Sequence, residues 1–190
     1  MLEPPILETE RLFVRMMADA DVAEVIRYYS ENEEHLRFSR PRVPADFYSE
    51  EFWKRQVHAA LAEFRTDRSL RLFLFEKPGN AKIVGNVNFT GFNRGAAQFC
   101  YLGYGIDRAY EGRGLMREGV EAAIRYVFET LNMHRIQANH VPWNRRSGGL
   151  LRRMGFTVEG YARDYLFLDG KWEDHVLTSL INPAWREGAT

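Results

Sequence analysis

Two glycines frame a short segment that is suited to binding a phosphate group. Gly112-Arg113-Gly114 follows an apolar segment ending in Tyr104-Gly105-Ile106 and precedes a stretch with helical periodicity. The first turn of a helix has backbone N–H groups without partners and the positive end of the helix dipole, so it binds anions such as pyrophosphate. Glycine lets the backbone approach the phosphates closely. No Gly-Lys-Ser/Thr of a Walker loop follows, and an ordinary strand–turn–helix joint would have the same pattern.

A second segment, Asn144-Arg145-Arg146-Ser147, precedes a short helical stretch that ends at Met154-Gly155-Phe156. Asparagine is a favoured helix N-cap, and Ser147 would fall in the first turn of that helix. A hydroxyl at this place can donate a hydrogen bond to a reacting group, or it can satisfy a backbone group of the same turn. The residues alone leave both roles open.

The elements that would position these segments follow from periodicity and turn residues. An antiparallel meander comes first and one βαβ-like unit later, which predicts an α+β fold. We expect one domain over residues 1–190, with a mixed central sheet of about six to seven strands flanked by about four helices. The expected strands are 7–17, 69–76, 82–90, 98–106, 135–140, 161–168 and 172–180, and the expected helices are 18–32, 49–64, 115–130 and 144–154, with a connection at 31–48 and a turn at 77–80.

Composition narrows the class of protein. Twenty-six basic and 26 acidic residues give a formal net charge of zero, so no direct nucleic-acid readout is expected. The first residues lack the basic start and apolar run of a signal peptide, and no stretch of about 18 apolar residues could span a membrane. These features favour a cytoplasmic protein.

The one cysteine, Cys100, lies in an apolar segment and is expected in the core, and the five histidines have no metal-ligand spacing.

Together these segments resemble the GNAT acetyltransferase superfamily, in which a glycine loop opens one helix and an Asn-x-x-Ser sequence opens a later one. Leu7-Glu8-Thr9-Glu10-Arg11-Leu12-Phe13-Val14-Arg15 is similar to the opening strand of its RimJ/RimL branch. The resemblance covers nearly the whole chain and is very specific over residues 98–185, where it points to the alanine-acetylating members. The stretches that carry it include Cys100-Tyr101-Leu102-Gly103-Tyr104, Gly114-Leu115-Met116, His134-Arg135-Ile136, Glu159-Gly160-Tyr161-Ala162 and Asp174-His175-Val176-Leu177-Thr178.

The resemblance implies acetyl-CoA as cosubstrate and a protein N-terminal amine as acceptor, in particular alanine of a small-subunit ribosomal protein. It implies that the backbone of Tyr104, Gly105 and Ile106 pairs with the pantetheine arm, as an added strand does. It implies that the loop at Gly112, with the N–H groups of Arg113, Gly114, Leu115 and Met116, holds the pyrophosphate. Asn144 would contact the pantetheine, and Ser147 would lie near the thioester sulfur, with Tyr165 as a second candidate proton donor. A monomer or a homodimer fits the family.

Two positions depart from the superfamily pattern. Glu111 stands where Gln or Arg is usual, and its carboxylate would repel a pyrophosphate unless it turned away. Tyr101 stands where many relatives have a Glu before the glycine–tyrosine segment, so no base role carries over to it. An α-amine with a pKa of about 8 costs only about 1.4 kcal/mol to neutralise at pH 7, against about 4.6 kcal/mol for a lysine side chain. An α-amine acceptor therefore needs only a weak base, and we expect direct attack on the thioester.

Two alternative functions stay open. The same site could acetylate a small-molecule amine such as an antibiotic or polyamine. The chain could also be a non-catalytic acetyl-CoA-binding or ribosome-assembly factor. Residues 30–51 hold six acidic residues against three arginines. In the resembling family this stretch borders the acceptor cleft, where an acidic rim would attract a basic protein tail; an ordinary solvated loop would have the same composition.

Overall fold

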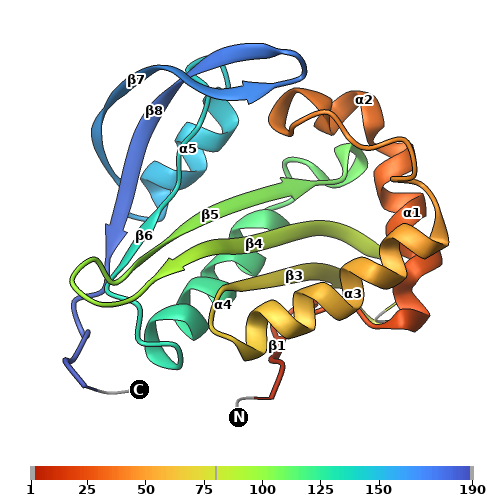
Figure 1. The fold of residues 1–190 in the computed structure, drawn as a ribbon, viewed down its shortest axis with the longest axis horizontal. Coiled ribbons are helices and arrows are strands. Elements are labelled where there is room, and N and C mark those ends of the chain that lie inside the picture. Colours follow the sequence, from red (N-terminus) through yellow and green to blue (C-terminus); the bar gives the residue numbers. More distant parts are fainter. Residues whose placement is uncertain (1–2, 80, 189–190) are drawn as a thin grey trace.

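A computed structural model describes residues 3–79 and 81–188. Within them an eight-stranded sheet has the order β1-β2-β3-β4-β5-β6-β8-β7 (Figure 1). All neighbouring strands are antiparallel except β5 and β6, which are parallel. The strands are β1 Ile6–Glu8, β2 Leu12–Arg15, β3 Ser69–Glu76, β4 Ile83–Asn93, β5 Phe99–Ile106, β6 Arg135–Gln137, β7 Thr157–Leu168 and β8 Lys171–Ile181. The helices are α1 Val22–Glu31, α2 Glu33–Leu36, α3 Glu50–Arg65, α4 Leu115–Glu129 and α5 Arg145–Arg153. The predicted α+β class is confirmed.

The sheet has one strand more than expected, because residues 7–17 form a hairpin instead of one strand. Thr9 reverses the chain: its N–H donates to the Leu12 carbonyl and its hydroxyl accepts from the Leu12 N–H. Residues 8–11 at the turn are all polar, but they include neither glycine nor proline, so the sequence predicts one strand running through them. The expected turn at 77–80 joins β3 to β4, although Asn80 lies outside the described residues.

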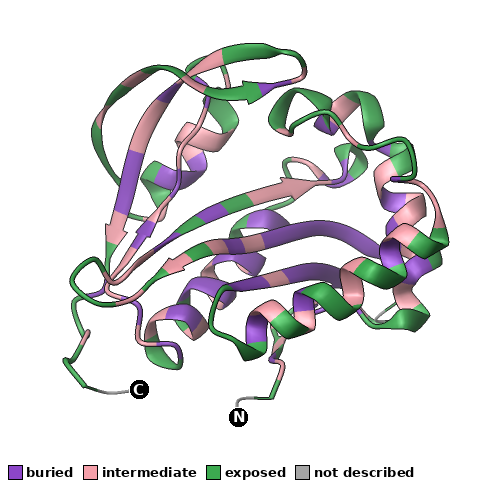
Figure 2. Ribbon diagram, viewed as in Figure 1, coloured by how far each residue is buried: buried purple, intermediate pink, exposed green. Residues whose placement is uncertain are grey.

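Helices cover both faces of the sheet, and β3 and β4 are buried along most of their length (Figure 2). Phe73 and Phe75 belong to the apolar cluster that holds α1 and α3 on one face. Leu72 and Leu74 alternate with them and face α4 on the other. Cys100 is fully buried in this second cluster, and burial raises the pKa of its thiol to about 12, so its expected place in the core is confirmed.

The expected connection 31–48 contains α2 and a single turn of 3-10 helix at Arg37–Ser39. It contacts the tip of the β7–β8 hairpin, where the Asp169 N–H lies 3.4 Å from the Arg40 carbonyl and Arg37 pairs with the Asp169 carboxylate. In Figure 1 the hairpin tip accordingly reaches toward α2. None of the helices in the described part of the chain is long and apolar enough to cross a membrane.

The packing of α4 on the sheet predicts a stability effect. A Cβ at Gly119 would lie 2.6 Å from Cδ2 of Leu74, so Gly119→Val forces the helix off the sheet and should cost about 1–3 kcal/mol. A thermal melt should show a Tm lowered by several degrees. Gly160→Val is the matched control, because a Cβ there meets nothing within 4 Å. Equal Tm values for the two variants would contradict this packing.

Candidate active site

One edge of β5 has backbone groups that no strand of the described residues pairs with. β6 pairs with β5 only from Phe99 to Tyr101. The Gln98 carbonyl accepts from the Arg135 N–H on the β6 side, and the Asp107 N–H donates to Val84 on the β4 side. Because backbone groups alternate between the two edges of a strand, those of Tyr104 and Ile106 point to the β6 side. This open edge is able to accept an added strand-like ligand.

The glycine loop lies at the end of this edge. Gly112 and Gly114 have φ values of 74° and 80°, a region that favours glycine. Gly114 is the N-cap of α4 and has no side chain to cap the helix, and the first intrahelical bond is donated by the Glu118 N–H to the Gly114 carbonyl. Backbone N–H groups of the first turn are thus left for an anion. Leu115 and Met116 bury their side chains in the core, so they can meet a ligand only through their backbone.

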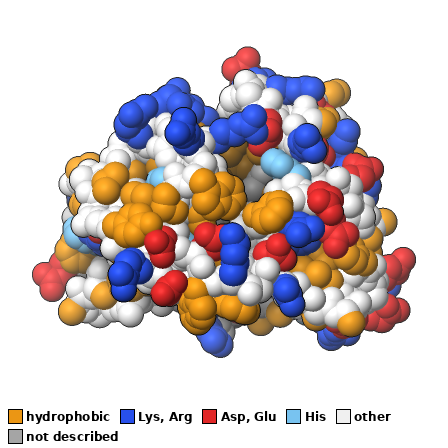
Figure 3. All heavy atoms as spheres, turned by 90° about the horizontal axis from the view of Figure 1, so that it is seen from above, with side chains coloured by type: hydrophobic (Ala, Val, Ile, Leu, Met, Phe, Trp, Pro, Cys, Tyr) orange, Lys and Arg blue, Asp and Glu red, His pale blue; other side chains and the backbone are white. Residues whose placement is uncertain are grey.

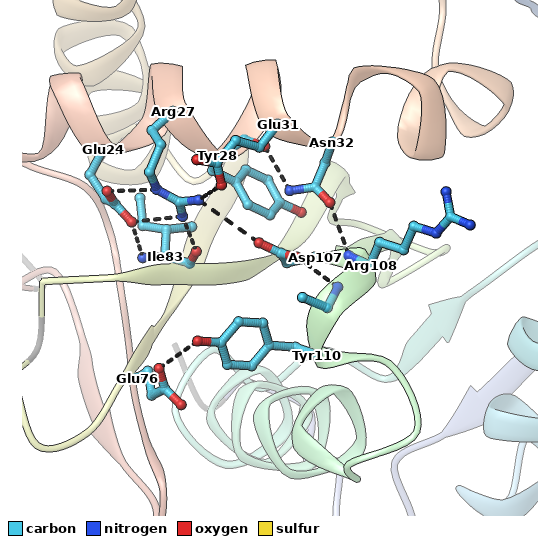
Figure 4. Close-up of polar contacts among 11 residues, drawn as sticks. Glu24, Arg27, Tyr28, Glu31, Asn32, Glu76, Ile83, Asp107, Arg108 and Tyr110 are labelled. Carbon is cyan, nitrogen blue, oxygen red and sulfur yellow. Dashed lines mark hydrogen bonds and ion pairs between the residues drawn. The ribbon is translucent and has the colours of Figure 1, made fainter.

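A polar network holds the segment between β5 and the loop (Figure 4). Asp107 accepts from the Ala109 N–H, and Asn32, between α1 and α2, accepts from the Arg108 N–H, both at 2.9 Å. Tyr110 donates to Glu76 at 2.7 Å, which ties the same segment to the end of β3. The loop therefore starts from a fixed backbone.

Ser147 and Tyr104 meet beside the open edge. Their hydroxyl oxygens are 2.8 Å apart, and the Asn144 side chain accepts from the Ser147 N–H at 3.0 Å. Asn144 thus caps α5, which is the role expected of a favoured N-cap residue. Its Nδ2 has no hydrogen-bond partner within residues 3–79 and 81–188, so it remains available to a ligand. Burial raises the pKa of Tyr104 to about 12, so this phenol keeps its proton at neutral pH, and either hydroxyl of the pair can be the donor.

Tyr165 belongs to a different group. It lies on β7, where its hydroxyl accepts from Asn139 Nδ2 at 3.1 Å and its ring lies 5.3 Å from that of His175. Burial raises the pKa of the Tyr165 phenol, and the neighbouring Tyr101 adds to the rise. The structure thus brings Tyr104, Asn144 and Ser147 together and places Tyr165 in a second cluster with Tyr101. Its part in proton donation stays a prediction.

The unusual Glu111 carboxylate is paired. It accepts a hydrogen bond from Arg146 of α5, and its other oxygen lies 3.5 Å from Nε2 of His35 in α2. The Arg146 side chain is 79% exposed, so this ion pair lies at the surface. The Glu111 charge that would repel a pyrophosphate is thus balanced by an arginine from across the loop.

Sequence reasoning missed a row of polar residues on the face of the sheet that α1 covers. Asn88 Nδ2 donates to Asn86 Oδ1 at 3.1 Å, and Asn86 Nδ2 donates to the hydroxyl groups of Tyr28 and Tyr29 at 3.2 and 3.4 Å. Burial raises the pKa of Tyr29 to about 12. The signal was present as two asparagines two positions apart in an otherwise apolar strand, a spacing that places both on one face.

The expected acidic rim is only partly free. Glu31 pairs with Arg27, and Glu34 with Arg37. Glu33 lines a cavity of about 360 Å³ between the α2 connection and the β7–β8 tip, together with Arg37, Arg40, Pro41, Arg42, Val43 and Asp169. Seen from above, this face is hollowed between its two halves, with acidic, basic and apolar side chains around the hollow (Figure 3).

Comparison with known proteins agrees with this geometry. A family model described as an acetyltransferase (GNAT) domain matches residues 11–157. The chain is 42% identical over 182 residues to the [ribosomal protein uS5]-alanine N-acetyltransferase of Escherichia coli (strain K12), covering 96% of this chain and 93% of that protein. The crystal structure of ribosomal-protein-S5-alanine acetyltransferase from Vibrio fischeri superposes with a TM-score of 0.91 at 32% identity, covering 96% of this chain and 99% of the other. Mycobacterium smegmatis RimJ in complex with CoA-disulfide shares the fold, with a TM-score of 0.85 at 23% identity over 95% of this chain and 90% of that one.

The chain therefore belongs to the GNAT acetyltransferase family. It is an acetyl-CoA-dependent N-acetyltransferase, and its expected cosubstrate is confirmed. The open edge of β5, the uncapped first turn of α4 and the free amide of Asn144 are donor groups that fit the pantetheine and pyrophosphate of that cosubstrate.

The glycine loop gives a first prediction about the site. Gly114→Val places a branched side chain at a φ of 80° in front of the first turn of α4, so acetyl-CoA affinity should fall at least tenfold, about 1.4 kcal/mol. Titration calorimetry measures it. Gly95→Val is the control, because Gly95 has a φ of 68° and lies in an open turn. Equal acetyl-CoA affinity in both folded variants would show that the loop does not hold the phosphates.

Glu111 gives a second prediction. Glu111→Gln removes a negative charge beside the loop and releases Arg146, so acetyl-CoA should bind up to about fivefold more tightly, within the roughly 1 kcal/mol of an exposed ion pair. Glu129→Gln, at the far end of α4, should leave the affinity unchanged. Weaker binding by Glu111→Gln alone would mean that the carboxylate organises the loop instead of opposing the phosphates.

Proposed function

We propose that this enzyme transfers the acetyl group of acetyl-CoA to the N-terminal α-amine of a protein, in particular an N-terminal alanine of a ribosomal protein such as uS5. The observation that carries the acceptor is the 42% identity, over 96% of this chain, to the Escherichia coli enzyme of that specificity. We place the reaction in the cytoplasm and treat residues 1–190 as one functional unit.

The reaction is a direct transfer between two bound substrates. The acceptor nitrogen forms a bond to the thioester carbonyl carbon, the carbon–sulfur bond breaks, and the proton lost from nitrogen is balanced by the proton gained on sulfur. Tyr104 and Ile106 would pair with the pantetheine through their backbone groups, Asn144 would bind it through Nδ2, and the first turn of α4 with Arg113 would hold the pyrophosphate. These contacts orient the thioester, so that the acceptor meets it in a productive geometry.

The Ser147–Tyr104 pair supplies the leaving group with a hydrogen bond. A thiol has a pKa of about 8.5, so the departing thiolate gains stability from a nearby donor as the carbon–sulfur bond breaks. Tyr104 keeps its proton because burial raises its pKa to about 12, and it can donate to the Ser147 oxygen. The Ser147 proton is then free to point at the sulfur. This hydrogen bond is stronger in the transition state, where negative charge develops on the sulfur, than in the bound substrate. Such a difference lowers the activation barrier.

The absence of a carboxylate at position 101 fits an α-amine acceptor. A fraction of α-amines is already neutral at pH 7, because their pKa is about 8. A lysine side chain, with a pKa of about 10.4, would need a stronger base. The rate should therefore rise with pH through the pKa of the acceptor amine and then level off.

Mass spectrometry of protein N-termini tests the acceptor. In cells without this protein, a ribosomal N-terminus beginning with alanine should lose its acetyl group, and the purified enzyme should restore it on a synthetic peptide of that sequence. A panel with a serine-starting peptide and spermidine identifies other acceptors. Transfer to spermidine alone would establish the small-molecule hypothesis, and acetyl-CoA binding with no transfer to any amine would establish a non-catalytic factor.

Ser147→Ala tests the leaving-group contact. It should lower kcat by roughly 10- to 100-fold, about 1.4 to 2.7 kcal/mol, with acetyl-CoA affinity nearly unchanged. The variant also leaves the Tyr104 hydroxyl without its 2.8 Å partner, so a stability loss of about 1–3 kcal/mol accompanies it. Tyr104→Phe with Ser147 intact separates the two effects. An unchanged kcat in Ser147→Ala, whatever its stability, would make Ser147 structural and direct attention to Tyr165.

A further inference from the structure

Asn88 lies on the floor of a space beside the reacting edge. It stands directly opposite Gly103 in the pairing of β4 with β5, so the two residues share one face of the sheet. A Cβ at Gly103 would meet nothing within 4 Å, which means that the space above this pair is open. Gly103 immediately precedes Tyr104, whose backbone groups point to the open edge. A molecule lying over Gly103 would therefore be next to the arm held at that edge.

The Asn88 amide is turned with its NH₂ group toward Asn86 and its oxygen away from it. Asn86 Nδ2 donates to the hydroxyl groups of Tyr28 and Tyr29, so the Asn86 oxygen is the group that receives Asn88 Nδ2. Asn88 Oδ1 is therefore an acceptor, and no hydrogen bond to it comes from elsewhere in the described ranges, 3–79 and 81–188. Asn86 is buried, whereas Asn88 is only half-buried.

The surroundings of Asn88 contain little free charge. Arg71 of β3 is its neighbour on the other side, and Nε of Arg71 lies 3.2 Å from Oε2 of Glu63 in α3. Hydrogen bonding from Ser69, with the nearby Arg71, lowers the pKa of Glu63, which stays ionised. Tyr29 of α1 is protonated at neutral pH, since burial raises its pKa to about 12. Burial also raises the pKa of Tyr28, the second tyrosine that Asn86 contacts. Tyr101, two positions before Gly103 on β5, lies on the same face.

We propose that Asn88 Oδ1 accepts a hydrogen bond from the acceptor amine and positions its nitrogen over Gly103 for attack on the thioester. This role rests on the proposed function and names the residue that orients the nucleophile. An uncharged hydrogen-bond acceptor suits this role, because a carboxylate would stabilise the ammonium form and raise the pKa of the amine. An amide oxygen binds the neutral amine without that penalty. The hydrogen bond to Asn86 holds the Asn88 side chain in place opposite Gly103.

Steady-state kinetics of Asn88→Ala test the role, using a synthetic peptide with an N-terminal alanine, a serine-starting peptide and spermidine as probes. On whichever amine the wild-type enzyme accepts, Asn88→Ala should lower kcat/KM by roughly 10- to 100-fold. Acetyl-CoA affinity should be unchanged. Asn93→Ala is the matched control, since Asn93 is an exposed asparagine at the end of the same strand. Its kcat/KM should stay within about twofold of wild type.

Asn88→Asp separates positioning from a structural role. Its carboxylate should pair with the ammonium form, so the acceptor KM at pH 6 should fall below that of wild type, while kcat at pH 7 falls because the amine is harder to deprotonate. The rise of rate with pH should move to higher pH. An unchanged kcat/KM in Asn88→Ala, or equal losses in the Ala and Asp variants at every pH, would overturn the proposal. Wild-type inactivity toward both peptides would instead overturn the proposed acceptor, and the role of Asn88 is then decided on spermidine.

Discussion

The site depends on the early end of the pairing between β5 and β6. β6 accompanies β5 for three residues, after which the backbone groups of Tyr104 and Ile106 have no strand beside them within the described chain. Backbone N–H and C=O groups left without partners inside a protein are costly, so such an edge requires water or a ligand. We propose that the extended, amide-containing arm of acetyl-CoA satisfies that requirement. Because β5 and β6 are parallel, the chain returns from the end of β5 to the start of β6 through α4. The N-terminus of α4 therefore lies at the end of the open edge.

Two helix N-termini meet this edge with different chemistry. Gly114 leaves the first turn of α4 without a side-chain cap, so its N–H groups stay available for phosphate oxygens. Asn144 caps α5 through its oxygen and leaves its NH₂ group to a ligand. Between the two helices, Arg146 pairs with Glu111 across the loop. In the proposed binding mode, the α4 terminus would hold the charged end of the cosubstrate, and the α5 terminus would bind its neutral arm and the sulfur.

Local signals in the sequence identified much of this arrangement. Gly112, Gly114 and the Asn144–Ser147 spacing depend on turn and cap chemistry, which neighbouring residues determine. The first hairpin was missed because Thr9 breaks a strand without a glycine or proline. The asparagine row and the contact between Ser147 and Tyr104 depend on strand register and helix packing, which join residues 43 positions apart. No local pattern in the sequence encodes such contacts. For the same reason the sequence could not show that Tyr165 lies apart from Ser147.

Amide hydrogen exchange of β5, followed by NMR with and without acetyl-CoA, tests the role of the open edge most directly. The amides of Tyr104 and Ile106 should exchange fast in the free enzyme and become protected on binding. The Gly103 and Gly105 amides, which face β4, should be protected in both states and serve as internal controls. Fast exchange of Tyr104 and Ile106 with acetyl-CoA bound at saturation would contradict the account, because the arm would then be held without pairing to β5.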